Sequence, residues 1–407
     1  MNKRSSLSAV LLLSAAFTTA NAHAQFDLEE SHTTVSLRGI HSVGRGIAWA
    51  SGTNGTVLRT EDGGYLWQTC TIPPGAEKLD FRGIQAFDEN TAIVMSSGPG
   101  DQSRLYKTTD GCQTWKLVFT NPDKEGFWDA ISMQSPKKGW VLGDPVNGQF
   151  SFLQYLAGRS EQRTVNGRLE QHTYPDTLDN AGHESLKADP ALQGAFAASN
   201  SALFVLPGAY RIYYGLPPQN SKEYVENLVP VDEEWFGTGG VGGAFVYIHN
   251  INAGDYLQYG SPPHISWNKV QVPLHSGTAS SGVFALCFYK TPQDAVHGIA
   301  VGGDYLKADE PAGTAAYTLD GGRNWQSAQT PPHGYRSSVA YDPDQKLWIT
   351  VGPNGTDISR DDGKNWTPLK PTPQEPPDAD KNWNALSLPF VVGQHGRIGR
   401  LHTITQK

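Results

Sequence analysis

Four octapeptides that share one pattern constrain the fold of this chain more than any other feature. Each consists of Ser or Thr, any residue, Asp, any residue, Gly, two further residues and Trp; they span residues 60–67, 108–115, 318–325 and 359–366, and the second has Cys112 in place of the Gly. We call these segments Asp boxes. In such a segment the hydroxyl and the carboxylate capture backbone N–H groups, glycine supplies a positive φ, and the Trp packs under the turn. We therefore assign a structural role to their Asp and Trp residues: Asp62, Trp67, Asp110, Trp115, Asp320, Trp325, Asp361 and Trp366.

The Asp boxes belong to a longer unit that occurs seven times. A first strand begins with a bulky residue, at 37–40, 81–84, 128–131, 196–198, 284–286, 335–337 and 383–386. A second strand then runs into glycine, at 47–52, 93–98, 140–143, 235–237, 299–302, 348–352 and 390–393. Units of roughly 40 to 60 residues with four short strands are typical of propeller blades, because one sheet buries both faces only between stacked neighbours. The sequence predicts an all-β, seven-bladed β-propeller with blades near 33–72, 80–120, 126–170, 193–274, 281–330, 335–370 and 382–407.

Two further features of the sequence concern the closure of the ring and the segments that interrupt the repeat. The last unit stops after its third strand near Leu401, so we expect residues 26–35 to supply the missing outer strand and remove an exposed edge. Two segments interrupt the repeat, one at 157–192 and one at 208–232. We interpret both as loops that can hold a short helix or a partner contact.

The N-terminus has the three-part plan of a cleaved secretory signal. Lys3 and Arg4 precede an apolar stretch at 7–17, and small residues lead to Ala24. That stretch is about half of the ~20 residues that a membrane anchor needs. We expect cleavage after Ala24, a mature chain at 25–407 without a membrane-spanning segment, and a periplasmic or extracellular monomer. Loss of Lys3 and Arg4 changes the formal charge from −8 to −10, and nothing implies a basic patch for nucleic acid.

The three cysteines, Cys70, Cys112 and Cys287, are too few and too odd in number for a disulfide framework. Cys70 and Cys112 belong to neighbouring repeats, so a single bridge between them stays open. The simpler interpretation is three small, half-buried residues.

One aligned position carries the polar residues that could form a site. The first strands begin on the face opposite the Asp boxes, and the residue after each bulky residue reads Arg38, Arg82, Asp129, Ala197, Ala285, Arg336 and Asn384 from blade one to blade seven. Blades six, seven, one and two are contiguous in a ring, which predicts one arc at the channel mouth with three arginines and Asn384. Asp129 begins the opposite arc. The turns of the same face add Asp144, Asp304, Asn354 and His395.

Two interpretations of these arginines remain open. Guanidinium groups bind a carboxylate, a sulfate or an acidic peptide through paired hydrogen bonds, which indicates a binding surface. Alternatively, each Arg pairs with an acid of the next blade and joins the blades. His249, His264, His395 and His402 lack metal-ligand spacing, and we expect neither a metal nor a cofactor.

Three motifs carry a resemblance to a known family: the Asp boxes, the Trp-Asp-Ala and Gly-Asp-Pro of the third repeat, and the phrase at 297–305, His-Gly-Ile-Ala-Val-Gly-Gly-Asp-Tyr. With these the chain resembles the photosystem II stability and assembly factor propellers over essentially its whole mature length, and most of all their bacterial relatives outside photosynthetic organisms. For the plant and cyanobacterial members, the resemblance implies a non-catalytic scaffold in the thylakoid lumen that binds a newly made reaction-centre subunit. The leading hypothesis is therefore an exported scaffold for a protein partner or an acidic ligand.

Asp boxes, also called BNR repeats, occur in sialidases and other glycoside hydrolases as well. The alternative is therefore a hydrolase or lyase acting on acidic saccharides, with Asp129, Asp144 and Asp304 as candidate acid and base. Glycoside hydrolysis requires two carboxyl groups at a defined separation, and the sequence specifies no such pair. The Phe-Arg-Ile-Pro signature of sialidases is absent too.

Overall fold

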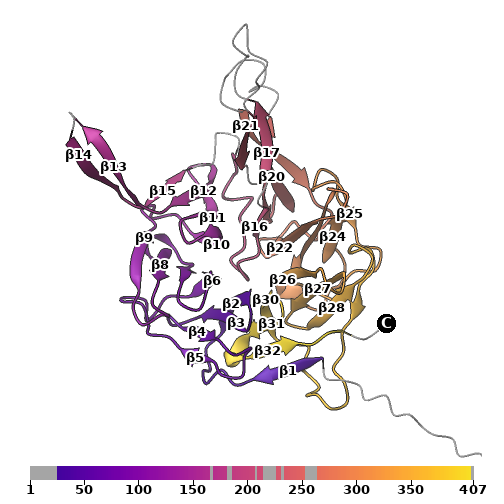
Figure 1. Ribbon diagram of the computed structural model, residues 1–407. Helices are drawn as coiled ribbons and strands as arrows, with labels where there is room; N and C mark the ends of the chain where they lie inside the picture. Colours follow the sequence, from indigo (N-terminus) through magenta and orange to yellow (C-terminus); the bar gives the residue numbers. More distant parts are fainter. Residues whose placement is uncertain are drawn as a thin grey trace, which may run out of the picture.

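The computed structural model describes residues 25–165, 168–180, 186–206, 209–213, 226–230, 233–252 and 264–404. Seven four-stranded antiparallel sheets stand side by side in a ring (Figure 1). The predicted all-β, seven-bladed propeller is confirmed. The expected signal segment at 1–24 and much of 208–232 lie outside the described residues. Within the described part, no helix is long and apolar enough to cross a membrane.

The blades follow the order of the chain, with the first strand of each nearest the axis. Blades one to three are β2 (Leu37–Gly44), β3 (Ile47–Gly52), β4 (Val57–Thr60) and β5 (Gln68–Thr69); β6 (Phe81–Ala86), β7 (Ala92–Ser96), β8 (Arg104–Thr108) and β9 (Lys116–Thr120); and β10 (Trp128–Ser135), β11 (Lys138–Val146), β12 (Gln149–Leu156) and β15 (Thr177–Asn180).

The second half of the ring is built in the same way. Blades four to seven are β16 (Leu203–Leu206), β19 (Glu233–Thr238), β20 (Phe245–Asn252) and β21 (His264–Gln271); β22 (Ser281–Lys290), β23 (Val296–Asp304), β24 (Ala315–Thr318) and β25 (Gln326–Ser327); β26 (Ser338–Asp342), β27 (Leu347–Gly352), β28 (Gly355–Ser359) and β29 (Thr367–Pro368); and β30 (Trp383–Ser387), β31 (Phe390–Gly393), β32 (Ile398–Leu401) and β1 (Phe26–Glu29). Among the described residues, three single-turn helices lie between strands: η1 (Gly100–Gln102), η2 (Tyr305–Lys307) and η3 (Gln394–Gly396).

The seventh blade takes its outer strand from the other end of the described chain. β1 pairs antiparallel with β32, with Phe26 opposite Leu401 and Glu29 opposite Ile398 (Figure 1). Phe26 is buried and stacks against Trp383 at a centroid distance of 6.3 Å. The ring is therefore closed between two remote segments of sequence, at the place where the sequence predicts a closing strand.

The Asp boxes are self-contained turns. In the first one, Thr60 Oγ1 donates to Asp62 Oδ1 over 2.8 Å and accepts from Gly64 N at 3.0 Å, while Leu66 N donates to Asp62 Oδ1 at 3.0 Å. The same three hydrogen bonds recur in the other three boxes. Trp67 is buried beneath its turn. In each box the Ser or Thr hydroxyl and the Asp carboxylate thus hold the turn through hydrogen bonds inside the octapeptide.

Two described segments contain strands where the sequence suggests loops. Within 157–192, β13 (Arg159–Val165) pairs with β14 (Arg168–Tyr174), and β15 forms the outer strand of blade three. Figure 1 shows this hairpin projecting outward from the ring. Within the second segment, β17 (Ala209–Tyr213) pairs with β18 (Glu226–Pro230). The loop interpretation was wrong for both hairpins. In β13 and β14 it failed because mostly polar residues give no alternating apolar signal.

A disulfide joins the first two blades, so the simpler interpretation of the cysteines was also wrong. Cys70 and Cys112 are bonded, with their Cα atoms 5.4 Å apart. Cys112 has a φ of 61°. It occupies the Asp-box position where Gly64 has a φ of 97°, so the Asp-box turn imposes a glycine conformation on a side-chain-bearing residue. Cys287 is free.

Candidate functional site

The polar residues of the channel mouth are positioned by β-bulges. In blades one, two, three and seven, the register of the inner pair of strands shifts directly after the first residue of the inner strand, and the residue within each shift is Arg38, Arg82, Asp129 or Asn384. A bulge leaves one residue out of the ladder and redirects its side chain. All four residues line one cavity of about 650 Å³ near the centre of the ring, together with Asp144. The structure thus brings together five of the nine polar residues that the sequence places on this face.

Aromatic side chains form much of the cavity wall. Phe196 and Phe284 stack with their centroids 3.8 Å apart, and Phe284 meets Tyr335 edge to face at 4.8 Å. Phe284 is the bulge residue of blade five, because the register there shifts between Val283 and Ala285. The remaining aromatic lining residues are Phe127, Tyr305 and Trp383. The alignment of the seven repeats missed Phe284, because it placed Ala285 at this position.

In blade four, the segment before the first strand lines the cavity, and not a bulge within that strand. The sequence places its first strand at 196–198, but the strand that pairs with β19 is β16, several residues later. The segment before β16 instead lines the cavity with Ala195, Phe196, Ala197 and Ala198. It is held by hydrogen bonds in both directions between Gly194 and Gly239, 3.1 and 2.9 Å long. This segment therefore contributes three small alanine side chains and one aromatic side chain, Phe196, to the cavity wall.

The two arginines of the cavity differ in whether an acidic side chain pairs with them. Arg82 Nε lies 2.8 Å from Asp80 Oδ2, and its NH1 donates to Ala197 O at 3.0 Å. Arg38 forms no ion pair with any described residue, and its Nε is buried without a hydrogen-bond partner. Burial lowers the pKa of Arg38 and the positive charge of Arg82 lowers it further, while the negative charge of Asp80, which is paired with Arg82, only partly opposes these effects. A partly buried cation without a counter-ion is costly, so an anionic group in this cavity would be stabilising.

The opposite wall carries two carboxyl groups, Asp129 and Asp144, whose pKa values are raised. Asp129 is 1% exposed, and its Oδ2 is buried without a hydrogen-bond partner. Burial raises its pKa well above the ordinary value, and the nearby charge of Asp144 raises it further, while Arg82 only partly opposes this. Burial likewise raises the pKa of Asp144 to about 6, although Ala195 N donates to its Oδ1 at 2.9 Å. These shifts favour the neutral acid for Asp129, which can then donate a hydrogen bond.

Arg336 is a correction to the predicted arc of three arginines. In blades one, three and seven, a backbone carbonyl packs against the last glycine of the second strand: Ser36 on Gly52, Phe127 on Gly143 and Asn382 on Gly393. In blade six Tyr335 makes this contact with Gly352, so Arg336 occupies the buried position and Ser337 the one that faces the cavity. The alignment was therefore one residue out of register, which exchanges the buried and exposed faces.

Apart from Asp144, the turn residues that the sequence adds to the site do not line the cavity. Asp304 is buried and caps η2 by accepting from Leu306 N at 3.1 Å, and it does not line the cavity. Asn354 accepts from Arg336 NH1 at 2.6 Å, and His395 lies in η3. Gln394, next to His395, lines the cavity instead.

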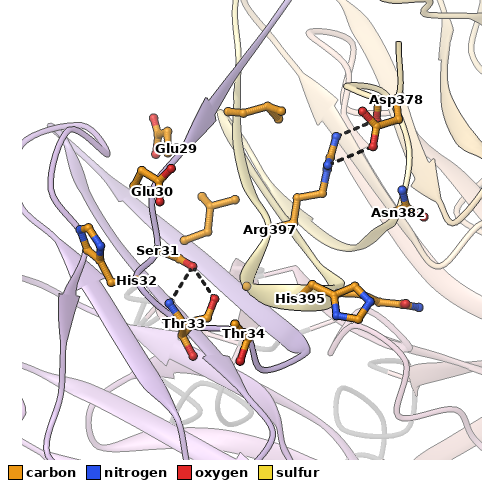
Figure 2. A pocket seen from close by; sticks show the side chains of 14 residues that line it. Glu29, Glu30, Ser31, His32, Thr33, Thr34, Asp378, Asn382, His395 and Arg397 are labelled. Atoms are coloured by element: carbon orange, nitrogen blue, oxygen red, sulfur yellow. Dashed lines mark hydrogen bonds and ion pairs between the residues drawn. The ribbon is translucent and has the colours of Figure 1, made fainter. Parts of the chain in front are cut away.

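A second hollow of about 830 Å³ lies at the rim of blade seven (Figure 2). Figure 2 shows Arg397 turned toward Asp378 and Ser31 bonded to Thr33. Arg397 NH1 lies 3.3 Å from Asp378 Oδ2, and its NH2 donates to the Asp378 carbonyl at 2.7 Å. This cation is already paired within the protein. The smaller central cavity, with unpaired Arg38 and Asp129, is therefore the better candidate site.

Comparison with known proteins finds solved structures with a similar fold. No protein-family model matches the chain, and no curated protein sequence matches it. Among solved structures, it is similar to "YCF48 bound to D1 peptide" (17% identity, TM-score 0.51, 95% of this chain and 99% of that chain) and to YCF48 from Cyanidioschyzon merolae (15%, 0.50, 93% and 99%). The extracellular domain of the putative hybrid two component system BT4673 from B. thetaiotaomicron is also similar (12%, 0.50), over 94% of this chain and 40% of that one. The resemblance to photosystem II assembly factors is thus confirmed at the level of the fold.

Proposed function

We propose that this protein is an exported, non-catalytic scaffold that binds a protein partner through the cavity at the channel mouth. Unpaired Arg38 carries the proposal. Its guanidinium faces a cavity that holds no described anion within ion-pairing distance of it, beside a second arginine that is already paired to Asp80. A free protein that keeps a cation in this state is preorganised for an anionic ligand group.

The rest of the cavity narrows the chemistry of that ligand. The aromatic wall of Phe196, Phe284 and Tyr335 suits an apolar side chain, and the acid of Asp129 can donate to a carbonyl oxygen. A peptide segment that presents a carboxylate next to an apolar residue offers all three groups. An inorganic anion would leave the aromatic wall unused, and a neutral peptide would leave Arg38 unpaired.

The comparisons support this proposal without extending it. One similar structure is described as bound to a D1 peptide, so a propeller of this fold does bind a peptide. Another is an extracellular domain, which is compatible with the export predicted from the N-terminal signal.

Affinity capture of exported proteins tests the proposal. The mature protein is compared with Arg38→Glu and Arg82→Glu, and with Arg323→Glu as a matched control in the third Asp box, where the Arg only reaches the Asp320 carbonyl. We expect the cavity variants to lose a partner that the control retains, and the isolated partner to bind the purified protein directly. Equal recovery by all four proteins would rule out the cavity as the binding site.

A second candidate function is a hydrolase or lyase acting on acidic saccharides. One observation favours it: Asp129 and Asp144 share a cavity, and both have raised pKa values, as a general acid requires. Asp304 does not line that cavity, so only this pair is available. A screen against sialosides and uronic-acid polymers, with Asp129→Asn and Asp144→Asn as controls, tests this function. Turnover that disappears in both variants would replace the scaffold proposal.

A further inference from the structure

The backbone nitrogen of Gln25 lies in a buried hydrogen-bond site. Gln25 N and Phe26 N both donate to Glu375 Oε1, at 2.9 and 2.6 Å. Glu375 belongs to the segment that joins blades six and seven, and Thr372 N donates to its other oxygen at 2.6 Å. Gln25 and Glu375 are both buried. Two segments that are 350 residues apart thus meet at one carboxylate.

This carboxylate is ionised but has no cationic partner. Burial alone would raise the pKa of Glu375, yet hydrogen bonds from Thr372, Phe26 and Gln25 outweigh it and lower the pKa. Among the described residues, no Lys, Arg or His lies within 4.0 Å of the Glu375 oxygens, although such pairs occur nearby, as between Arg397 and Asp378. A buried carboxylate is costly without a positive charge. Gln25 N is the group best placed to supply one.

We propose that cleavage between Ala24 and Gln25 creates the missing cation, and that Glu375 is the docking carboxylate for the new N-terminus. Hydrolysis by a signal peptidase breaks the Ala24–Gln25 peptide bond; water supplies the hydroxyl to the Ala24 carboxyl and a proton to the Gln25 nitrogen. The amine takes a further proton from solvent to become an ammonium. An amide that only donated one hydrogen bond then becomes one half of a buried ion pair.

The position of the cut matters to within one residue. The Gln25 carbonyl accepts from His402 N at 3.0 Å, which continues the ladder between β1 and β32. A chain that began at Phe26 would lose this bond, and one that began at Ala24 would carry its charge past Glu375. Processing at this bond therefore strengthens the closure of the ring, and the proposal rests on export but not on the binding cavity.

Reactivity of the α-amine tests the proposal directly. The protein is produced with its own signal in a Gram-negative periplasm, and its first residue is identified by mass spectrometry. An amine-selective acylating reagent is then applied to the folded protein near neutral pH. Only the neutral amine reacts, and each unit by which Glu375 raises its pKa slows labelling about tenfold. We expect a first residue of Gln25 and an α-amine labelled at least about tenfold more slowly than in the urea-unfolded chain.

Two variants and one chain with a different first residue show whether slow labelling depends on the ion pair between the Gln25 amine and Glu375. They distinguish this from a general loosening of the segment around Glu375. In Glu375→Gln the charge is lost while the size is kept, so labelling of Gln25 should approach the unfolded rate. Asp378→Asn, three residues along and paired only with Arg397, should leave labelling slow. A chain engineered to begin at Ala24 should react rapidly with or without Glu375.

The free amine has a second reaction that gives an independent readout. A neutral N-terminal Gln nitrogen attacks its own side-chain Cδ, breaking the Cδ–Nε2 bond and releasing ammonia to leave a closed ring. Glu375 should suppress this step, so cyclised chains should accumulate faster in Glu375→Gln than in the parent protein. A first residue other than Gln25, full cyclisation of the parent protein, or equal labelling of parent and Glu375→Gln would each overturn the proposal.

Discussion

Arg336 and Asp357 form an ion pair in which both side chains are buried inside blade six. Arg336 Nε donates to Asp357 Oδ2 at 2.9 Å, and His333 Nδ1 lies 2.8 Å from the other carboxylate oxygen. Asn354 Oδ1 accepts from the same guanidinium. Every nitrogen of this arginine therefore has a partner within its own blade, and its role is to hold β28 against the start of β26.

Replacement of Arg336 tests this structural role. Arg336→Met leaves the Asp357 carboxylate buried with only His333 and should lower the free energy of unfolding by about 3–5 kcal/mol. Urea unfolding at pH 7.5 measures the change, with Arg323→Met on the surface as the control. Partner capture by the folded fraction should be unchanged. A loss below about 0.5 kcal/mol, the range of ordinary surface substitutions, would contradict the assignment.

The contrast between Arg336 and Arg38 shows what the sequence could predict. The Asp boxes depend on contacts within eight residues, so their turns and the repeat could be predicted from the pattern alone. The positions of Arg38, Arg82, Asp129 and Asn384 followed because one bulky residue marks each inner strand. At blade six the bulky Tyr335 is followed by a buried arginine, and only pairing with Gly352 fixes the register. This contact joins two segments of one blade, and the identity of the residues at 335–337 does not show which of them pairs with Gly352.

Arg38 should show the opposite behaviour to Arg336. Arg38→Met removes a partly buried, unpaired charge that is repelled by Arg82, so we expect stability to be unchanged or higher, and in any case not more than about 0.5 kcal/mol lower. Binding of the partner should be lost in the same variant. Thermal unfolding and capture on one preparation measure both effects. If Arg38→Met unfolds as readily as Arg336→Met, Arg38 has a structural role and the scaffold proposal loses its main support.

Asp144 makes stability depend on pH in a definite direction. Its ordinary pKa of 3.8 is raised to about 6 in the folded protein. Between about pH 4 and 6 the unfolded chain gives up this proton first, so the folded state loses stability as pH rises, by up to about 3 kcal/mol, and no further change from this group follows above that range.

Asp144→Asn should remove that dependence. The variant should match the parent protein near pH 4 and exceed its stability by an amount on the order of 2–3 kcal/mol at pH 8. Urea midpoints at the two pH values give the comparison, and Asp101→Asn, at an exposed side chain, is the control. If the variant gained the same stability at both pH values, burial would not raise the pKa of the Asp144 carboxyl.

The disulfide between Cys70 and Cys112 offers a test that separates cross-linking from backbone strain. It spans 42 residues, and the chain-entropy model gives such a loop about 4 kcal/mol of stabilisation. Cys70→Ala should lose this amount under oxidising conditions and should match the reduced parent protein once a thiol reductant is added.

Cys112→Gly should behave differently because Cys112 has a φ of 61°. It loses the cross-link as Cys70→Ala does, but glycine adopts this conformation without the steric cost of about 1 kcal/mol that a side chain incurs. Thr108 Oγ1 still accepts from the backbone nitrogen at this position, so the Asp-box turn is retained. In reductant, Cys112→Gly should therefore be about 1 kcal/mol more stable than the reduced parent protein. Urea unfolding with and without reductant distinguishes the two contributions, and a Cys112→Gly variant less stable than reduced Cys70→Ala would show that the Cys112 side chain stabilises the turn by packing.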